Sequence, residues 1–121
     1  MRSWLKDGTA KKMTPVEAAW LAGFFDGEGS LVSYKSGRKR TGRAFKMQIA
    51  NTDLRSIKRC LAITGVGGVG HRYKNHPRWK YQEIWYVNAQ RDLVDVLKQI
   101  RPYLIIKGDV VDKFLDKWKE V

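Results

Sequence analysis

The stretch LAGFFDGEG, residues 21–29, ends an apolar run rich in small residues with two carboxylates set among glycines. Upstream of it, Thr14 is a candidate N-cap, Pro15 stands at the first helical position, and Glu17 can close a capping box. The pattern predicts a helix that begins after Thr14 and ends at about Asp26, where glycines stop it.

The rest of the chain alternates between strand-like and helix-like periods. Residues 30–51 predict two strands around a glycine-containing turn, because Phe45, Met47 and Ile49 alternate with polar residues. The segments that follow predict a helix at 52–65, strands at 69–74 and 81–89, and helices at 91–104 and 109–118. The order αββαββα plus a C-terminal helix indicates an α+β fold, with one four-stranded antiparallel sheet packed on helices.

Each of the three later helices is expected to bury one apolar face. These faces comprise Leu54, Ile57 and Leu61; Leu93, Val96, Leu97 and Ile100; and Val110, Val111, Phe114, Leu115 and Trp118. Residues 1–13 are expected to be a loosely held lead-in and residues 14–121 a single domain, since 121 residues are few for two domains.

Composition excludes several classes of protein. No apolar run approaches the roughly 20 residues that span a bilayer, and the first residues lack the apolar segment of a signal peptide. The single cysteine, Cys60, excludes an internal disulfide and fits a reducing intracellular compartment, either the cytoplasm or an organelle with its own genome. No small-molecule cofactor is expected, because the glycines of residues 65–70 leave a predicted helix rather than open one. His71, His76 and Cys60 lack zinc-site spacing.

The charge balance indicates a polyanionic partner. Lys and Arg number 24 against 12 acids, a net charge of +12 that is spread along the chain. In a folded, tryptophan-rich domain this distribution is most typical of nucleic-acid binding. A ribosomal protein, or one that is merely basic and soluble, is the alternative that composition leaves open.

Small residues form a stripe along the first predicted helix. Ala19, Gly23 and Gly27 lie at positions i, i+4 and i+8, with Ala18 and Ala22 beside them. Such a stripe lets a second helix approach closely, although it could also pack against the chain's own sheet. Because only one such helix is present, its natural partner is a second copy. The predicted homodimer interface comprises Ala19, Ala22, Gly23 and Gly27.

A homodimer of this kind would gather carboxylates. Two-fold symmetry brings the C-terminal ends of the paired helices together, so Asp26 and Glu28 of both copies meet at the negative ends of two helix dipoles. A hard divalent cation such as Mg²⁺ relieves that repulsion and suits a partner rich in phosphate. For Glu28 alone, an ordinary solvated carboxylate at a helix end is the alternative.

The stretch LAGFFDGEG resembles the signature of the LAGLIDADG homing endonucleases position for position, with like-for-like changes. One copy of the motif is similar to the homodimeric branch of that family. The resemblance implies the LAGLIDADG fold over residues 14–121. It also implies a site-specific endonuclease that makes staggered double-strand breaks in a long pseudo-palindromic DNA target by metal-dependent phosphodiester hydrolysis.

The same resemblance implies roles for individual residues. Glu28 and the main-chain carbonyl of Gly27 would bind Mg²⁺, with Mn²⁺ as a substitute, while Asp26 would support the helix end. Asn51, Arg55 and Lys107 match the family's other catalytic residues more loosely, as groups that organise water and stabilise the attacked phosphate. For Arg55 and Lys107, generic surface charge is the alternative.

The outward faces of the strands are expected to bind double-stranded DNA, since a twisted antiparallel ribbon fits the major groove. The predicted contacts are Tyr34, Ser36, Arg38, Arg40, Lys46, Gln48, Arg72, Lys74, Gln82 and Tyr86. A competing hypothesis is a non-cleaving DNA-binding regulator, or an RNA-splicing maturase whose partner would be RNA. The presence of Glu28 and Lys107 favours the enzyme.

Overall fold

The computed structural model describes residues 8–35, 43–72 and 81–119. In chain order its elements are α1 (Pro15–Glu28), β1 (Gly29–Lys35), β2 (Arg43–Asn51), α2 (Leu54–Thr64), β3 (Gly68–Arg72), β4 (Gln82–Val87), α3 (Gln90–Ile100), the short 3₁₀ helix η1 (Arg101–Tyr103) and α4 (Gly108–Lys119). The predicted α+β class and element order are therefore confirmed. Within the described ranges, no helix combines the length and the apolarity that crossing a bilayer requires.

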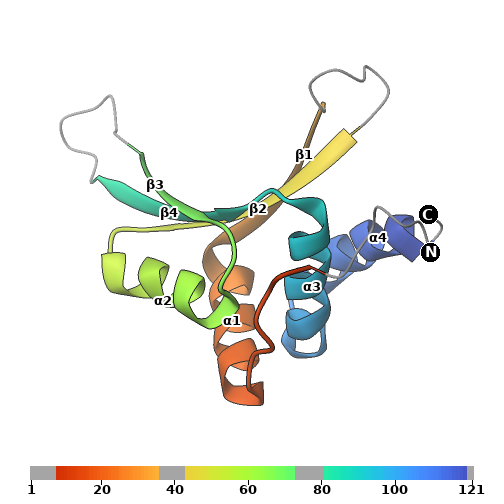
Figure 1. Ribbon diagram of the computed structural model, residues 1–121, viewed down its shortest axis with the longest axis horizontal. Helices are drawn as coiled ribbons and strands as arrows, with labels where there is room; N and C mark the ends of the chain where they lie inside the picture. The colour runs from red at the N-terminus through yellow and green to blue at the C-terminus, as the bar shows by residue number, and fades with distance from the viewer. Residues whose placement is uncertain (1–7, 36–42, 73–80, 120–121) are drawn as a thin grey trace.

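The four strands form one antiparallel sheet in the order β1-β2-β4-β3. The helices lie beneath it, and none of the helices in the described ranges covers the opposite face of the sheet (Figure 1). The strands rise at both ends, away from the helices, so the uncovered face is concave (Figure 1). We call this surface the open face of the sheet.

Helix α1 begins as its sequence predicts. The Thr14 hydroxyl accepts a hydrogen bond from the Glu17 amide at 3.2 Å, and the Glu17 carboxylate accepts one from the Thr14 amide at 2.9 Å. The prediction that the helix ends at about Asp26 is wrong by two residues, because it continues to Glu28. A glycine inside a helix costs stability without ending it, and the backbone leaves helical values only at Gly29, where β1 starts.

Side chains from every layer meet in one core between the sheet and the helices. Its largest fully buried members include Trp85, Phe25, Phe114, Leu21 and Met47. The predicted apolar face of α3 is confirmed, since all four of its residues are fully buried. The core therefore fixes α1 and α3 against the same side of the sheet.

The predicted apolar faces of α2 and α4 need correction. The buried stripe of α2 follows Ile57, Cys60 and Ile63, whereas Leu54 is 37% exposed. In α4, Val111 and Phe114 are buried but Val110 is 40% exposed. Leu54 and Val110 both lie in the first turn of their helix. Periodicity locates a face around a helix, but it does not say where along the axis the covering layer ends.

The segment before α1 is held more firmly than the sequence suggests. The Lys11 amide donates to the Thr64 carbonyl at 2.7 Å, and the Met13 amide donates to the Gln99 side chain at 2.6 Å. The Met13 side chain is buried in the core. The expectation of a loosely held lead-in is therefore wrong for residues 8–13, because this segment finds partners on both α2 and α3.

Burial raises the pKa of the Cys60 thiol to about 12. We expect this thiol to resist 5,5′-dithiobis(2-nitrobenzoic acid) at pH 8 in the native protein and to react once per chain in guanidinium chloride, since only the thiolate is nucleophilic. Because the unfolded thiol ionises first, its contribution to stability is complete below the unfolded pKa of about 8.5 and is lost as the pH rises toward 12. Rapid labelling of native protein would contradict the buried placement.

Candidate functional site

The carboxylate of Asp26, in the last turn of α1, accepts three backbone hydrogen bonds from the loop between η1 and α4. The donors are the amides of Ile105 at 2.7 Å, Ile106 at 3.1 Å and Lys107 at 2.9 Å. Asp26 is 8% exposed, so this contact lies largely out of water. We call this arrangement the Asp26 clamp, and it ties residues 105–107 to the C-terminal end of α1.

The clamp also places Lys107. Its ammonium donates to the main-chain carbonyl of Asp26 at 2.7 Å and lies 5.9 Å from the centre of the Phe25 ring. A carbonyl in the last turn of a helix is a favourable position for a cation, because the helix dipole is negative there. The lysine that the sequence singled out therefore lies at the end of α1, bound to the main chain of Asp26.

The clamp sets the protonation of Asp26. Burial by itself raises the pKa of this carboxyl, but the amide donors of Ile105, Lys107 and Ile106, together with the charge of Lys107, outweigh burial and lower the pKa below its ordinary value. Asp26 is therefore ionised and fully engaged at neutral pH. Asp26 therefore supports the end of α1, as predicted, by accepting hydrogen bonds from three backbone amides.

Glu28, two residues further on, is in the opposite situation. It is exposed and is the last residue of α1, and its carboxylate makes no hydrogen bond or ion pair with any residue that the structure describes. Of the two motif carboxylates, Glu28 is thus the one available to a metal or a substrate. It carries its negative charge at the negative end of a helix, where charge is unfavourable unless a cation joins it.

Metal binding by Glu28 is compatible with its chemistry but incomplete within one chain. A carboxylate and the neighbouring Gly27 carbonyl are hard oxygen donors, which Mg²⁺ prefers. Across the described ranges, however, no three His, Cys, Asp or Glu side chains come together in a group that could hold an ion. One chain therefore supplies part of a site, and further oxygen ligands must come from outside it.

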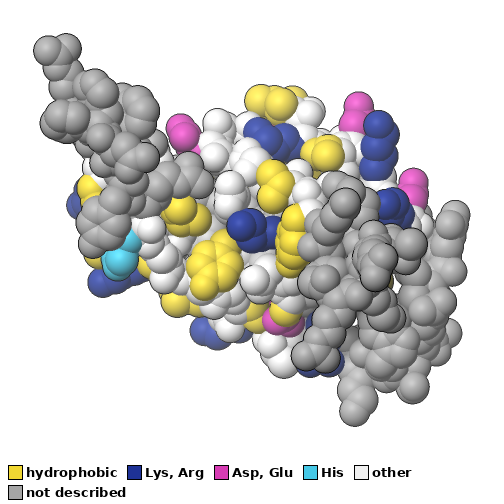
Figure 2. All heavy atoms as spheres, turned by 90° about the horizontal axis from the view of Figure 1, so that it is seen from above, with side chains coloured by type: hydrophobic (Ala, Val, Ile, Leu, Met, Phe, Trp, Pro, Cys, Tyr) yellow, Lys and Arg dark blue, Asp and Glu magenta, His cyan; other side chains and the backbone are white. Residues whose placement is uncertain are grey.

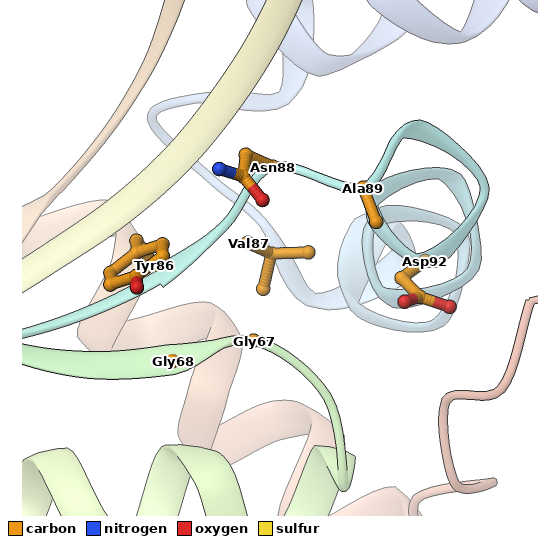
Figure 3. A pocket seen from close by; sticks show the side chains of 7 residues that line it. All are labelled: Gly67, Gly68, Tyr86, Val87, Asn88, Ala89 and Asp92. Carbon is orange, nitrogen blue, oxygen red and sulfur yellow. The ribbon is translucent and has the colours of Figure 1, made fainter.

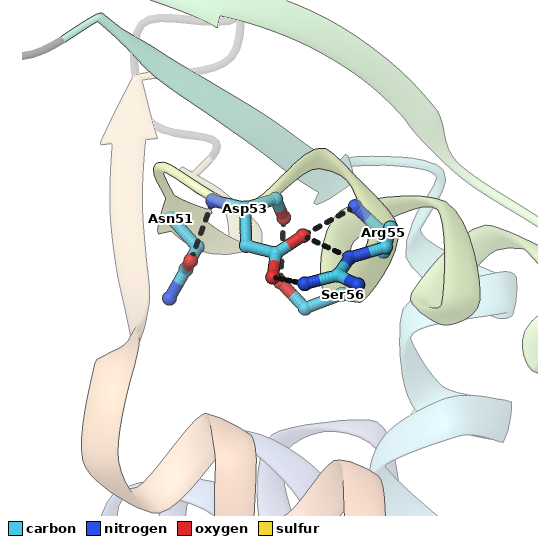
Figure 4. Close-up of polar contacts among 4 residues, drawn as sticks. All are labelled: Asn51, Asp53, Arg55 and Ser56. Atoms are coloured by element: carbon cyan, nitrogen blue, oxygen red, sulfur yellow. Dashed lines mark hydrogen bonds and ion pairs between the residues drawn. The ribbon is translucent and has the colours of Figure 1, made fainter.

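Asn51 and Arg55 lie at the end of β2 and the start of α2. The Asn51 side-chain oxygen accepts from the Asp53 amide at 2.8 Å, close to the point where α1 passes into β1 (Figure 4). Arg55 turns back onto Asp53, with its guanidinium 2.9 Å from the carboxylate, and its side chain is 91% exposed. Hydrogen bonds from Arg55 hold the pKa of Asp53 below its ordinary value. Asp53 also caps α2, so Arg55 has a structural partner here.

The predicted DNA contacts within the described ranges share the open face. Opposite residues in an antiparallel pair point to the same side, and Met47, Ile49, Trp85 and Val87 are buried against the helices. Their neighbours along the strands therefore face the open side. These neighbours are Lys46, Gln48, Gln82 and Tyr86, and Tyr34 shares their side through the β1–β2 register.

The remaining predicted contacts are placed less fully. Arg72 occupies the β3 position opposite Gln82. Ser36, Arg38, Arg40 and Lys74 lie outside the described residues. In the view onto the open face, Lys and Arg side chains lie among hydrophobic ones in the middle, and acidic side chains are seen toward the margins (Figure 2). Contact of this surface with DNA stays a prediction.

The small-residue stripe of α1 divides between two faces. Ala18 and Ala22 are buried in the chain's own core, so the inclusion of Ala22 in the dimer interface is wrong. Ala22 directly precedes Gly23 in the sequence, but its side chain lies on the face of α1 that is buried in the core. Ala19, Gly23 and Gly27 are exposed, and a Cβ atom added to either glycine would meet nothing within 4 Å.

Sequence reasoning missed two features of this region. The amides of residues 105–107 were not foreseen as the partners of Asp26, because backbone donors leave no signal in residue type. The side chains of Ile105 and Ile106, which are 90% and 71% exposed, were not assigned to any face. Two adjacent isoleucines between helical segments were the available signal.

Comparison with known families gives one clear match. The model of the LAGLIDADG-like domain family matches residues 15–119, which is nearly the whole chain. Among curated proteins, no sequence matches.

Solved structures of homing endonucleases share the fold. I-CvuI bound to the I-CreI target has a TM-score of 0.68 at 22% identity, with 84% of this chain and 64% of that one covered. The archaeal intron-encoded homing endonuclease I-Vdi141I in complex with DNA has a TM-score of 0.66 at 14% identity, with 84% of this chain and 65% of that one covered. I-GzeII in complex with its DNA target has a TM-score of 0.63 at 23% identity, with 90% of this chain and 36% of that one covered. The chain thus spans less than two thirds of each neighbour's length.

The Asp26 clamp predicts a measurable loss of stability in Asp26→Asn. An amide cannot accept three hydrogen bonds with the strength of a carboxylate, so the free energy of unfolding should fall by about 1.5–3 kcal/mol. Because the folded pKa of Asp26 is lowered, its contribution is present above the unfolded pKa of about 3.9 and is lost as the pH falls through the folded value. Urea unfolding at neutral pH and below pH 4 measures both effects.

The matched control is Glu28→Gln, which removes a charge from the same helix end without removing a described contact. Its free energy of unfolding should stay close to that of the wild type. Equal losses in the two variants would contradict the clamp.

Proposed function

This chain belongs to the LAGLIDADG-like domain family, and we propose on that basis that it is a site-specific DNA endonuclease that hydrolyses phosphodiesters. The observation that carries the proposal is the different environment of the two acids in the motif, Asp26 and Glu28. Asp26 is occupied by backbone amides, whereas Glu28 is exposed at the same end of α1, where Lys107 donates to the Asp26 carbonyl. The structural neighbours named above are homing endonucleases bound to DNA, which supports the same substrate class.

The substrate proposal also follows from charge and shape. A net charge of +12 favours a polyanion, and the concave open face offers amide, hydroxyl and ammonium groups along its strands. Gln48 suits an adenine edge in the major groove. Because phosphate contacts release counterions, binding to double-stranded DNA should weaken steeply with salt.

In the proposed reaction each residue has a limited task. Glu28 and the Gly27 carbonyl would hold Mg²⁺ or Mn²⁺, which when bound stabilises negative charge on the attacked phosphate. Lys107 is the chain's own cation at that place, and it offsets charge that develops during attack. Asn51 offers a side-chain amide to a water molecule near the same helix end.

We further propose that the active form is a homodimer paired through α1. The exposed Ala19, Gly23 and Gly27 form a strip, and at both glycines a Cβ atom would have no described neighbour within 4 Å beyond the helix's own backbone. A second backbone at close range would explain why these positions remain small. Two-fold pairing would bring two Glu28 carboxylates together, and it implies a pseudo-palindromic target cut on both strands with a short stagger.

The first test of the chemistry is Glu28→Gln. The change keeps shape and removes charge, so it should abolish cleavage while leaving the fold and sequence-selective binding largely intact. A target is first selected from a random double-stranded library with Mg²⁺. Single-turnover cleavage of that target then compares variant with wild type. Cleavage by Glu28→Gln at the wild-type rate would show that the chemistry lies elsewhere.

Two controls separate chemistry from binding. Lys107→Met should slow the single-turnover rate more than it weakens DNA binding, because its proposed task is at the transition state. Selection with Ca²⁺ detects binding without requiring cleavage. A wild type that selects a site but never cuts it with Mg²⁺ or Mn²⁺ would support a non-cleaving regulator instead, and a preference for RNA would support a maturase.

The dimer proposal predicts that Gly23→Leu wedges the paired helices apart. Sedimentation should show a dimer for the wild type at micromolar concentration and a monomer for Gly23→Leu, with cleavage lost. Ala62→Leu is the matched control, since it adds a leucine at an exposed position of α2. A wild-type monomer with full cleavage activity would refute the proposal.

A further inference from the structure

One row of residues crosses all four strands on the open face. Ser30 of β1 lies opposite Gln48 of β2, Gln48 lies opposite Tyr86 of β4, and Tyr86 lies opposite Gly68 of β3. Three of the four positions carry side chains, and the fourth is bare backbone. The two centre positions, Gln48 and Tyr86, are thus direct cross-strand neighbours.

The ring of Tyr86 occupies the space that a side chain at position 68 would need. A Cβ atom built on Gly68 would lie 2.6 Å from the Tyr86 Oη atom and 2.8 Å from its Cζ atom. Real Cβ atoms do not approach so closely, so the ring must lie directly against the β3 backbone. Figure 3 shows the hydroxyl of Tyr86 turned toward Gly68, beside a hollow lined by Val87, Asn88 and Asp92.

The direction in which the ring leans matters for its neighbour. Strand β4 lies between β2 and β3, so a ring that rests on β3 leans away from β2. The Gln48 amide is therefore left uncovered by the one large side chain beside it in the row. If Tyr86 instead stood upright or leaned toward β2, it would compete with Gln48 for the same part of any bound surface.

We propose that Gly68 is a specificity-determining position, because the absence of its side chain holds Tyr86 over β3 and leaves Gln48 free to read a base. This inference rests on the proposed DNA-binding function. Gln48 pairs its amide with an adenine edge, and the ring of Tyr86 makes an apolar contact with the adjoining base pair, for which a thymine methyl is the suitable group. Gly68 itself touches no base, and it acts through the ring.

The structure provides a matched control on the same strand. Gly70 also faces the open side, but a Cβ atom built there would lie 3.9 Å from the Tyr86 Cε1 atom, an ordinary van der Waals distance. A methyl group at position 70 leaves the ring in place, whereas a methyl group at position 68 displaces it. Comparison of the two alanine variants therefore isolates ring position from the general effect of removing a glycine.

The experiment has one arm without DNA and one with it. In proton NMR of the free protein, the Gly68 Hα signals should be shifted upfield by the overlying ring, and Tyr86→Ala should remove that shift. Gly68→Ala should displace the Tyr86 ring signals more than Gly70→Ala does. Thermal unfolding of all variants checks that each remains folded.

In the DNA arm, sites are selected by binding from a random double-stranded library with Ca²⁺. Gly68→Ala should lower discrimination about tenfold at one or two adjoining base pairs per half-site, and Gly70→Ala should leave the profile unchanged. Adding Gly68→Ala to Tyr86→Ala should change nothing further, since the ring through which Gly68 acts is already gone.

The outcomes separate this inference from the proposed function. A wild type that selects no DNA site overturns both. A wild type that selects a site whose profile is the same in Gly68→Ala overturns the inference and leaves the function standing. Equal changes in Gly68→Ala and Gly70→Ala, or a further change on the Tyr86→Ala background, would also overturn it.

Discussion

The arrangement of this molecule depends on the carboxylate of Asp26. Through three backbone amides it joins the end of the first helix to a loop about 80 residues later in the chain. Charge-assisted hydrogen bonds in a site this buried are among the stronger ones available to a protein. The end of α1, the start of β1 and the start of α4 therefore meet at one point. Lys107 lies at that point because it belongs to the clamped loop.

The two motif acids show how local environment assigns different tasks to similar side chains. Asp26 has its pKa lowered by amide donors and serves the fold. Glu28 is exposed at the negative end of the same helix, a placement that contributes nothing to stability and opposes it slightly. The ammonium of Lys107 is already bound to the Asp26 carbonyl at this helix end. An acidic residue placed at the negative end of a helix, with no contact that compensates for the unfavourable charge, is a strong candidate for a functional residue.

Much of the fold could be predicted from the sequence because its signals are local. The capping box of Thr14 and Glu17, the strand alternation around Met47, and the apolar face of α3 each depend on neighbouring residues alone. Other features depend on contacts that residue type does not encode. Burial of Ala22, exposure of Leu54 and the amide partners of Asp26 follow from where distant layers come to lie. Of the candidate site, the sequence named residues whose roles stay predictions. Only the structure separated Asp26 and Arg55, which have partners, from Glu28, whose carboxylate has none among the described residues.

Three features of the chain are incomplete within a single copy. At the end of α1, a single exposed carboxylate offers part of a cation site, and along that helix a Cβ atom built at Gly23 or Gly27 would meet no other described part of the fold within 4 Å. Above them, no helix that the structure describes covers the concave open face of the sheet. Under the proposed function, a single two-fold axis beside α1 supplies the missing partner of the carboxylate and of the exposed glycines, and it sets the direction of the two open faces. It pairs the helices and joins two carboxylates at the axis. It also extends the two open faces away from each other, so that chemistry occurs at the centre of the target and base reading on either side.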